Sequence, residues 1–217
     1  MMLPKHPKQP SSMVEDLIVQ YRQKREEIQS RLKEFMRVPE SQYFYELVYC
    51  LLTPQSSAEN AWQVVESLRR NGFQKKGFNP EPYLSNRKHY IRFHRSKSQH
   101  LLAAREKYRD ASSLFTDKLP AFKKRELLVA SFKGLGYKES THFLRNIGKS
   151  EDLAILDRHI LRCLQRYNVI GATPATLSKK IYLEIEAAFQ EFAAVTEIPM
   201  TELDLLFWWI GTGRIFK

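Results

Sequence analysis

The sequence has few cysteines and few glycines. The first shortage argues against a cysteine-bound metal site, and the second favours a helical chain. Its two cysteines, Cys50 and Cys163, lie far apart and form no Cys-x-x-Cys pair, which argues against a zinc or iron–sulfur site. Apolar neighbours flank both, so we expect buried, reduced thiols. Eight glycines in 217 residues fit a helical chain, because glycine destabilises helix interiors. We expect no metal ion and no other cofactor.

Long apolar runs are also missing. None reaches the roughly 18 residues that a membrane-spanning helix needs. The first ten residues are polar, contain Pro4, Pro7 and Pro10, and lack the apolar centre of a signal peptide. We therefore expect a cytoplasmic protein.

Acidic residues are outnumbered by basic ones. Lys and Arg total 35 against 24 Asp and Glu, which gives a formal net charge of +11 and a pI near 9.6. A surplus of this size favours a polyanionic partner, most simply nucleic acid. The alternative is a basic surface that serves solubility alone. The apolar share of 43% is enough to form one substantial domain or two small lobes.

The alternation of apolar and polar residues that is typical of half-buried strands is absent, and helical spacing dominates. We predict an all-α protein with short helices and loops over 72–96. The segment 41–52 is apolar over most of its circumference, which predicts a central helix. The longer helices are expected at 12–38, 41–52, 57–71, 97–110, 123–132, 138–147, 155–167, 176–194 and 200–209.

A glycine-containing turn joins two of these helices at Gly134, Leu135 and Gly136. It can be an ordinary interhelical turn in which glycine supplies a positive φ. It can also be a helix–hairpin–helix, in which the amides of the turn and the start of the next helix face a DNA phosphate. The basic charge and the residues that follow favour the second interpretation.

Two of those following residues can do chemistry on a sugar. Lys138 comes two positions after Gly136, and a neutral amine there can attack a sugar carbon. Asp157 can stabilise positive charge that develops on the sugar. The alternatives are a phosphate contact for Lys138 and an N-cap for Asp157 in a helix that starts near Arg158.

This combination resembles the helix–hairpin–helix DNA glycosylase superfamily, which includes endonuclease III. The resemblance implies that the hairpin grips DNA, that Lys138 is the nucleophile and that Asp157 completes the catalytic pair. The segment Leu51-Leu52-Thr53-Pro54-Gln55 is similar to the early loop that enters DNA. Gln55 then fills the gap left by a flipped nucleotide, although a loop or capping amide is the alternative.

Finer features resemble one branch, the 8-oxoguanine DNA glycosylase/AP lyases of the archaeal-type second family. The chain lacks the cysteine cluster of endonuclease III, contains Arg92-Phe93-His94 followed by Lys97, and ends in lysine. The resemblance implies that Trp208 and Lys217 help to hold the oxidised base, with the carboxylate of Lys217 as an acceptor. It also implies that Phe93 stacks on the base. We expect Trp209 to be a core aromatic.

The resemblance implies two helical lobes with the active site in the cleft between them. Residues 1–36 and 153–217 form one lobe, and 37–152 form a helical-barrel lobe that ends in the helix–hairpin–helix. The implied enzyme is a nucleoid-associated monomer that flips 8-oxoguanine out of double-stranded DNA, excises it through a lysine Schiff base and cleaves the strand by β-elimination. The alternatives are the same chemistry on oxidised pyrimidines, or a DNA-binding module without catalysis.

Overall fold

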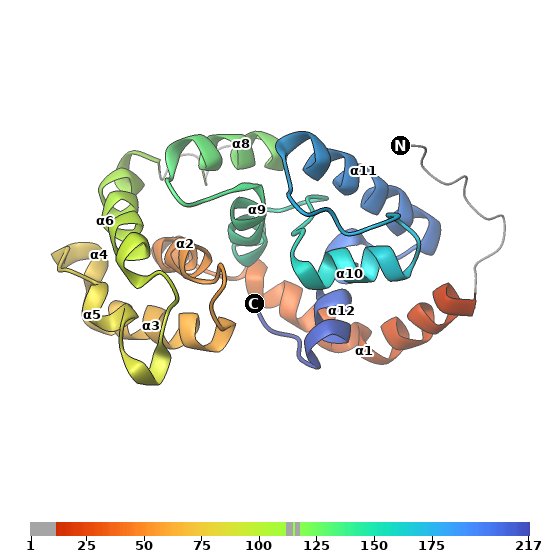
Figure 1. Ribbon diagram of the computed structural model, residues 1–217, viewed down its shortest axis with the longest axis horizontal. Coiled ribbons are helices and arrows are strands. Elements are labelled where there is room, and N and C mark those ends of the chain that lie inside the picture. The colour runs from red at the N-terminus through yellow and green to blue at the C-terminus, as the bar shows by residue number, and fades with distance from the viewer. Residues whose placement is uncertain (1–11, 112–114, 116–117) are drawn as a thin grey trace. The chain divides into compact units, whose positions relative to one another are not determined.

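The structure is a computed structural model that describes residues 12–111, 115 and 118–217, and these residues form helices and loops without a strand (Figure 1). The predicted all-α class is confirmed. No helix in the described ranges is long and apolar enough to cross a membrane. The longer helices are α1 (Ser12–Met36), α2 (Tyr43–Leu52), α3 (Ala58–Arg70), α6 (His94–Ala111), α8 (Ala121–Ser131), α9 (Tyr137–Asn146), α10 (Arg158–Arg166), α11 (Lys179–Thr196) and α12 (Met200–Thr212).

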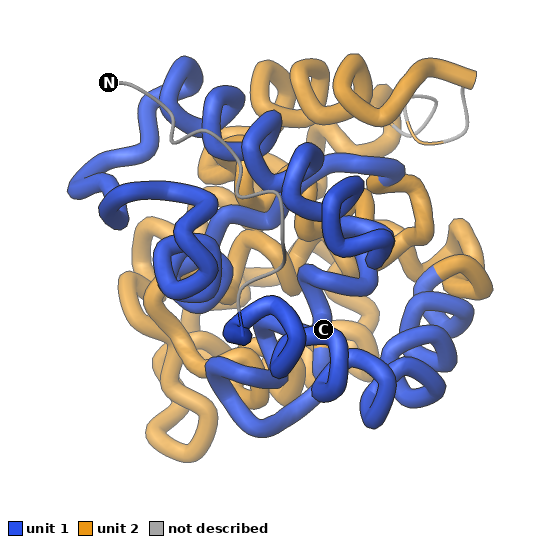
Figure 2. The backbone as a smooth tube through the Cα atoms, turned by 90° about the vertical axis from the view of Figure 1, so that its right-hand side faces the viewer, with its two compact units in different colours: residues 1–35, 151–216 blue, residues 36–150, 217 orange. Residues whose placement is uncertain are grey.

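The chain divides into two compact units, which Figure 2 shows in different colours. Unit 1 comprises residues 1–35 and 151–216, and unit 2 comprises residues 36–150 together with Lys217. These limits lie within two residues of the expected ones. Lys217 is the exception, because we expected it in the lobe formed by the two termini and it belongs to unit 2. It does so because side chains of α2 and α3 bind its amine.

Helix α2 is the centre of unit 2. Nine of its ten residues are buried, and it packs against α3, α6 and α9. The prediction of a central helix is therefore confirmed. Residues Glu40–Gln42 form a separate 3-10 turn, η1, so the α-helix begins two residues later than expected.

The region predicted as short helices and loops contains three brief elements. These are α4 (Phe73–Lys76), α5 (Glu81–Leu84) and η2 (Arg87–His89). Helix α3 before this region begins where the sequence predicts, because the hydroxyl of Ser57 accepts a hydrogen bond from the Asn60 N–H at 3.3 Å. Helix α6 after it begins at His94, three residues earlier than expected.

In unit 1, α12 packs against α10 and α11 around an aromatic core. The Phe207 ring stacks on Phe189 and on Tyr167, with 5.6 Å between ring centres in both pairs. Helix α10 begins at Arg158 rather than near Ile155, because residues 154–156 are buried in a non-helical segment in which the Asp157 N–H donates to the Ile155 carbonyl at 2.8 Å. The carboxylate of Glu186 holds that segment by accepting the Ala154 N–H at 2.8 Å.

Candidate active site

The glycine hairpin connects α8 to α9, and the apolar side chain at its centre, that of Leu135, is buried in unit 2. Leu135 is buried and donates its N–H to the Phe132 carbonyl at 3.1 Å, whereas both glycines are exposed. Gly134 has a φ of +94°, and a Cβ there would lie 2.6 Å from Nδ1 of His100. Gly136 is extended, with a φ of −92°. The positive φ expected for this turn therefore belongs to Gly134.

Glu139, which the sequence analysis did not single out, links the hairpin to Lys138. One carboxylate oxygen accepts the Gly136 N–H at 3.2 Å, and the other lies 3.0 Å from the Lys138 ammonium. The position is the third of α9, where an acidic residue commonly satisfies the free N–H groups of the helix start. The spacing of Glu139 from Gly136 is the sequence feature that could have revealed this residue. One hairpin donor is thus occupied by a carboxylate, and the Lys138 amine is in contact with a proton acceptor.

Asp157 caps the N-terminus of α10. Its Oδ1 accepts the backbone N–H groups of His159 and Ile160 at 2.8 and 2.9 Å. The capping alternative for this residue is therefore observed. Among the described residues Oδ2 has no hydrogen-bond partner, and the side chain is half-buried. One oxygen orients the carboxylate while the other is available for a second role.

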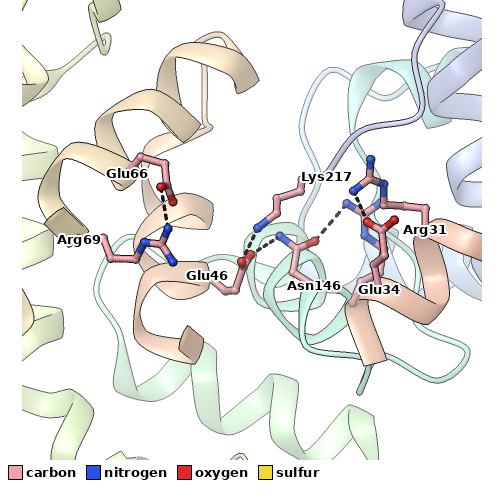
Figure 3. A network of polar contacts seen from close by, with 8 residues as sticks. Arg31, Glu34, Glu46, Glu66, Arg69, Asn146 and Lys217 are labelled. Carbon is pink, nitrogen blue, oxygen red and sulfur yellow. Dashed lines mark hydrogen bonds and ion pairs between the residues drawn. The ribbon is translucent and has the colours of Figure 1, made fainter. Parts of the chain in front are cut away.

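The side chain of Lys217 is bound in a cage in unit 2. Its ammonium forms an ion pair with Glu46 and lies 3.9 Å from the centre of the Trp62 ring and 5.6 Å from that of Tyr49. Figure 3 shows Lys217 and Asn146 both directed at the Glu46 carboxylate, which accepts a hydrogen bond from the Asn146 amide at 3.1 Å. The sequence could have revealed Glu46, because it is the one carboxylate in the otherwise apolar segment that forms α2.

His142 is a buried histidine in the same neighbourhood as Lys217. Burial lowers its pKa well below the ordinary value, and the charges of Arg145, Lys138 and Lys217 act in the same direction. A hydrogen bond with the backbone of Lys217 opposes them. The His142 ring meets that of Tyr49 edge to face, with 5.6 Å between ring centres, so His142 packs beside the cage of Lys217. The His142 side chain packs within the helix bundle.

Two of the residues expected to enter DNA or contact the base, Gln55 and Phe93, share an unusual backbone. Gln55 and Phe93 have φ values of +55° and +59°, in the left-handed region that non-glycine residues rarely adopt. Both side chains are exposed, Phe93 to 52%. The backbone therefore presents an amide and an aromatic ring to solvent at two loop positions.

The two C-terminal tryptophans lie in unit 1 and are half-buried. Trp208 contacts the His159 ring edge to face, with 5.0 Å between ring centres. The ammonium of Lys24 lies 5.2 Å from the centre of the Trp209 ring. Trp209 is therefore a partly exposed ring beneath a lysine rather than the core aromatic that we expected.

The predicted site residues divide between the units. Unit 2 holds the hairpin, Lys138, Gln55, Phe93 and Lys217, and unit 1 holds Asp157 and Trp208. In the part of the chain that the structure describes, no group of three or more His, Cys, Asp or Glu side chains is placed to bind a metal ion.

Comparison with known proteins decides the family. A sequence profile described as 8-oxoguanine DNA glycosylase matches residues 28–198. The chain belongs to this family. It is 41% identical over 206 residues to the 8-oxoguanine DNA glycosylase/AP lyase of Fusobacterium nucleatum, a match that covers 91% of this chain and 94% of the relative. The corresponding protein of Methanocaldococcus jannaschii is 36% identical, with 85% and 87% coverage.

Solved structures of the family have the same fold. The 8-oxoguanine glycosylase/lyase of M. jannaschii, in complex with a 15mer DNA that contains 8-oxoguanine, matches with a TM-score of 0.85 and 30% identity. That match covers 95% of this chain and all of the other. The 8-oxoguanine DNA glycosylase of Thermotoga maritima gives a TM-score of 0.80 at 30% identity, covering 95% of this chain and 99% of the other. The resemblance identified from the sequence is thereby confirmed.

Proposed function

We propose that this protein is a bifunctional DNA repair enzyme that excises 8-oxoguanine from double-stranded DNA and then cleaves the abasic strand. The observation that carries the proposal is similarity over nearly the whole chain to relatives of that activity, one of them solved with 8-oxoguanine DNA. The protein acts as a monomer. Its net charge of +11 makes the affinity for DNA fall steeply as salt is added.

Lys138 is the nucleophile of the proposed glycosylase step. The amine lies just past the hairpin that binds the phosphate, so the sugar of the gripped strand is within its reach. Its lone pair forms a bond to C1′ while the bond from C1′ to the base breaks, and the base leaves with that electron pair and takes up a proton. Lys138 must first lose its own proton, and Glu139 at 3.0 Å is the acceptor in contact with it.

Asp157 stabilises the positive charge that develops on the sugar in this step. Its cap contacts use Oδ1, which leaves Oδ2 to face the cationic sugar. The reaction requires both Asp157 and Lys138 to reach the same nucleotide when DNA is bound.

The lyase step follows from the use of an amine rather than water. The sugar ring opens to a Schiff base on Lys138, and loss of a proton from C2′ breaks the C3′–O bond by β-elimination. Water then hydrolyses the imine, which releases the cleaved strand and regenerates the lysine.

Residues away from the hairpin select the base. The nucleotide must leave the duplex to be cut, and Gln55 fills the space that it vacates. Phe93 and Trp208 offer flat rings for stacking on the flipped base. Lys217 contacts the base from a position that its caged ammonium fixes.

Borohydride trapping tests the proposal. The reductant converts the Schiff base into a permanent bond, so the wild-type protein gives a covalent adduct with an 8-oxoguanine duplex. Lys138→Gln gives no adduct. The matched control, Lys133→Gln, changes an exposed lysine of the same hairpin and still forms the adduct at saturating DNA. Failure of the wild-type protein to trap any damaged duplex would leave only the DNA-binding alternative.

A further inference from the structure

Lys97 of α6 is a buried lysine with its ammonium directed at one loop. The residue is only 6% exposed. Its Nζ donates to the carbonyl oxygens of Leu52 and Pro54, both at 2.6 Å, and to the hydroxyl of Ser56 at 3.1 Å. These acceptors lie on both sides of Gln55, so one ammonium spans the loop that connects α2 to α3.

The same lysine is linked to the loop that carries Phe93. Its backbone N–H donates to the Phe93 carbonyl at 3.0 Å. The hydroxyl of Ser56, which accepts from Lys97, also accepts the backbone N–H of Arg92 at 3.0 Å. The Gln55 loop and the Phe93 loop are therefore joined through Lys97 and Ser56.

Both joined loops hold a non-glycine residue in the left-handed region. Such a backbone persists only where its surroundings impose it. Gln55 and Phe93 are exposed, so their own side chains do not supply that restraint. The hydrogen bonds to the adjoining Pro54, Ser56 and Arg92 do.

We propose that Lys97 is a positioning residue that fixes Gln55 and Phe93 together in the conformation needed to extrude the base and stack on it. The inference rests on the proposed function, and it adds a residue that acts through the two loops without touching DNA. The amine is suited to the task because an ammonium supplies three donors to three acceptors.

We call the contacts that Lys97 makes with the Gln55 and Phe93 loops the clamp. The charge of Lys97 in this clamp depends on pH. Burial is the main reason that the pKa of Lys97 is lowered to about 8, and the Lys138 ammonium lowers it further while the Glu139 carboxylate raises it. Both of these charged groups come from α9. Above pH 8 the neutral amine has two hydrogens for three acceptors, so the loops lose part of their restraint.

The test compares two reactions of Lys97→Met with those of Lys107→Met, a control at an exposed position of the same helix. Single-turnover excision of 8-oxoguanine requires base extrusion, whereas cleavage of a preformed abasic site does not require a stacked base. Loss of charge-assisted hydrogen bonds predicts that Lys97→Met slows excision by about tenfold or more and abasic-site cleavage by less than about threefold. The control changes neither rate.

An equal loss in both reactions would overturn the proposal, because Lys97 would then act through its charge on Lys138. Unchanged excision would overturn it as well. In the wild-type protein the ratio of excision to abasic-site cleavage falls as the pH rises through 8, and in Lys97→Met the ratio is flat.

Hydrogen exchange on the wild-type protein keeps the inference testable if Lys97→Met does not fold. After correction for intrinsic rates, the protection of the hydrogen-bonded amides of Thr53, Ser56 and Arg92 falls above pH 8, and that of α3 does not. Constant protection of the two loops across this range would contradict the clamp. The wild-type protein could process neither DNA substrate and still lose protection in its two loops above pH 8. That result would refute the proposed function and would support the clamp.

Discussion

The ammonium of Lys217 lies 3.9 Å from the centre of the ring of Trp62, a residue 155 positions earlier in the chain. The counter-charge is Glu46, and both ends of the ion pair are shielded, with 14% and 4% of their side chains exposed. A desolvated cation gains more from an aromatic ring than a hydrated one does, and removing one partner of a shielded ion pair is strongly destabilising. This enclosure holds the Lys217 ammonium in unit 2.

We expect Glu46→Gln to lower the free energy of unfolding by about 3 kcal/mol, because it leaves a shielded ammonium without its counter-charge. Glu66→Gln is the matched control, since Glu66 pairs with the more exposed Arg69 at 2.7 Å. The control should change stability by less than about 1 kcal/mol. Urea unfolding measures both, and equal effects would mean that the enclosure adds nothing.

Two substitutions at Asp157 separate capping from catalysis. Asp157→Asn retains an oxygen for the α10 N-cap, so unfolding free energy should change by less than about 0.5 kcal/mol while excision is lost. Asp157→Ala should lose excision and also about 1 kcal/mol of stability. Ser178→Ala, which removes the N-cap of α11, should cost similar stability and leave excision intact. An active Asp157→Asn variant would reduce Asp157 to a cap.

Gly134→Ala should damage the hairpin through its backbone. The φ of +94° and the 2.6 Å approach to His100 together predict a loss of about 1–2 kcal/mol in stability and a several-fold loss in DNA affinity. Gly171→Ala is the control, because a Cβ at Gly171 has no neighbour within 4 Å. Unfolding curves and fluorescence anisotropy with a labelled duplex measure the two effects. Full DNA affinity in Gly134→Ala would contradict a phosphate-binding role for the hairpin.

The two cysteines should be inert in the folded protein. Both are free and buried, which confirms the expectation from their apolar neighbours. Burial raises the pKa of Cys163 to about 11 and that of Cys50 well above its usual value. Because the thiolate is the reactive form, neither should be alkylated by iodoacetamide at pH 8, and both should react in concentrated urea. Rapid labelling of one thiol without denaturant would show that its helix opens locally.

Local features of the fold were predictable because they depend on neighbouring residues. Helical spacing identified α2 as central, since its apolar residues surround the helix, and Ser57 marked the start of α3. The start of α10 was placed too early, because Ile155 and Leu156 are apolar and continue the helical pattern. They lie instead in a buried, non-helical segment, in which Glu186, distant in sequence, accepts the Ala154 N–H.

The same distinction applies to the candidate site. Lys138 and the hairpin lie within five residues of one another, so a motif reveals them. The cage of Lys217 and the clamp of Lys97 join residues that are 171 and 45 positions apart, to Glu46 and Leu52 respectively. No local pattern encodes such a pairing. Only the packing of α2 against the elements around it brings these residues together.

The most direct test of the account is single-turnover base release from a panel of duplexes that differ only in one base. The panel contains 8-oxoguanine, undamaged guanine and an oxidised pyrimidine at the same position. We expect the protein to release 8-oxoguanine and cleave the strand, to leave guanine intact and to process the pyrimidine far more slowly. Release of the oxidised pyrimidine in preference to 8-oxoguanine, or of no base at all, would contradict the account.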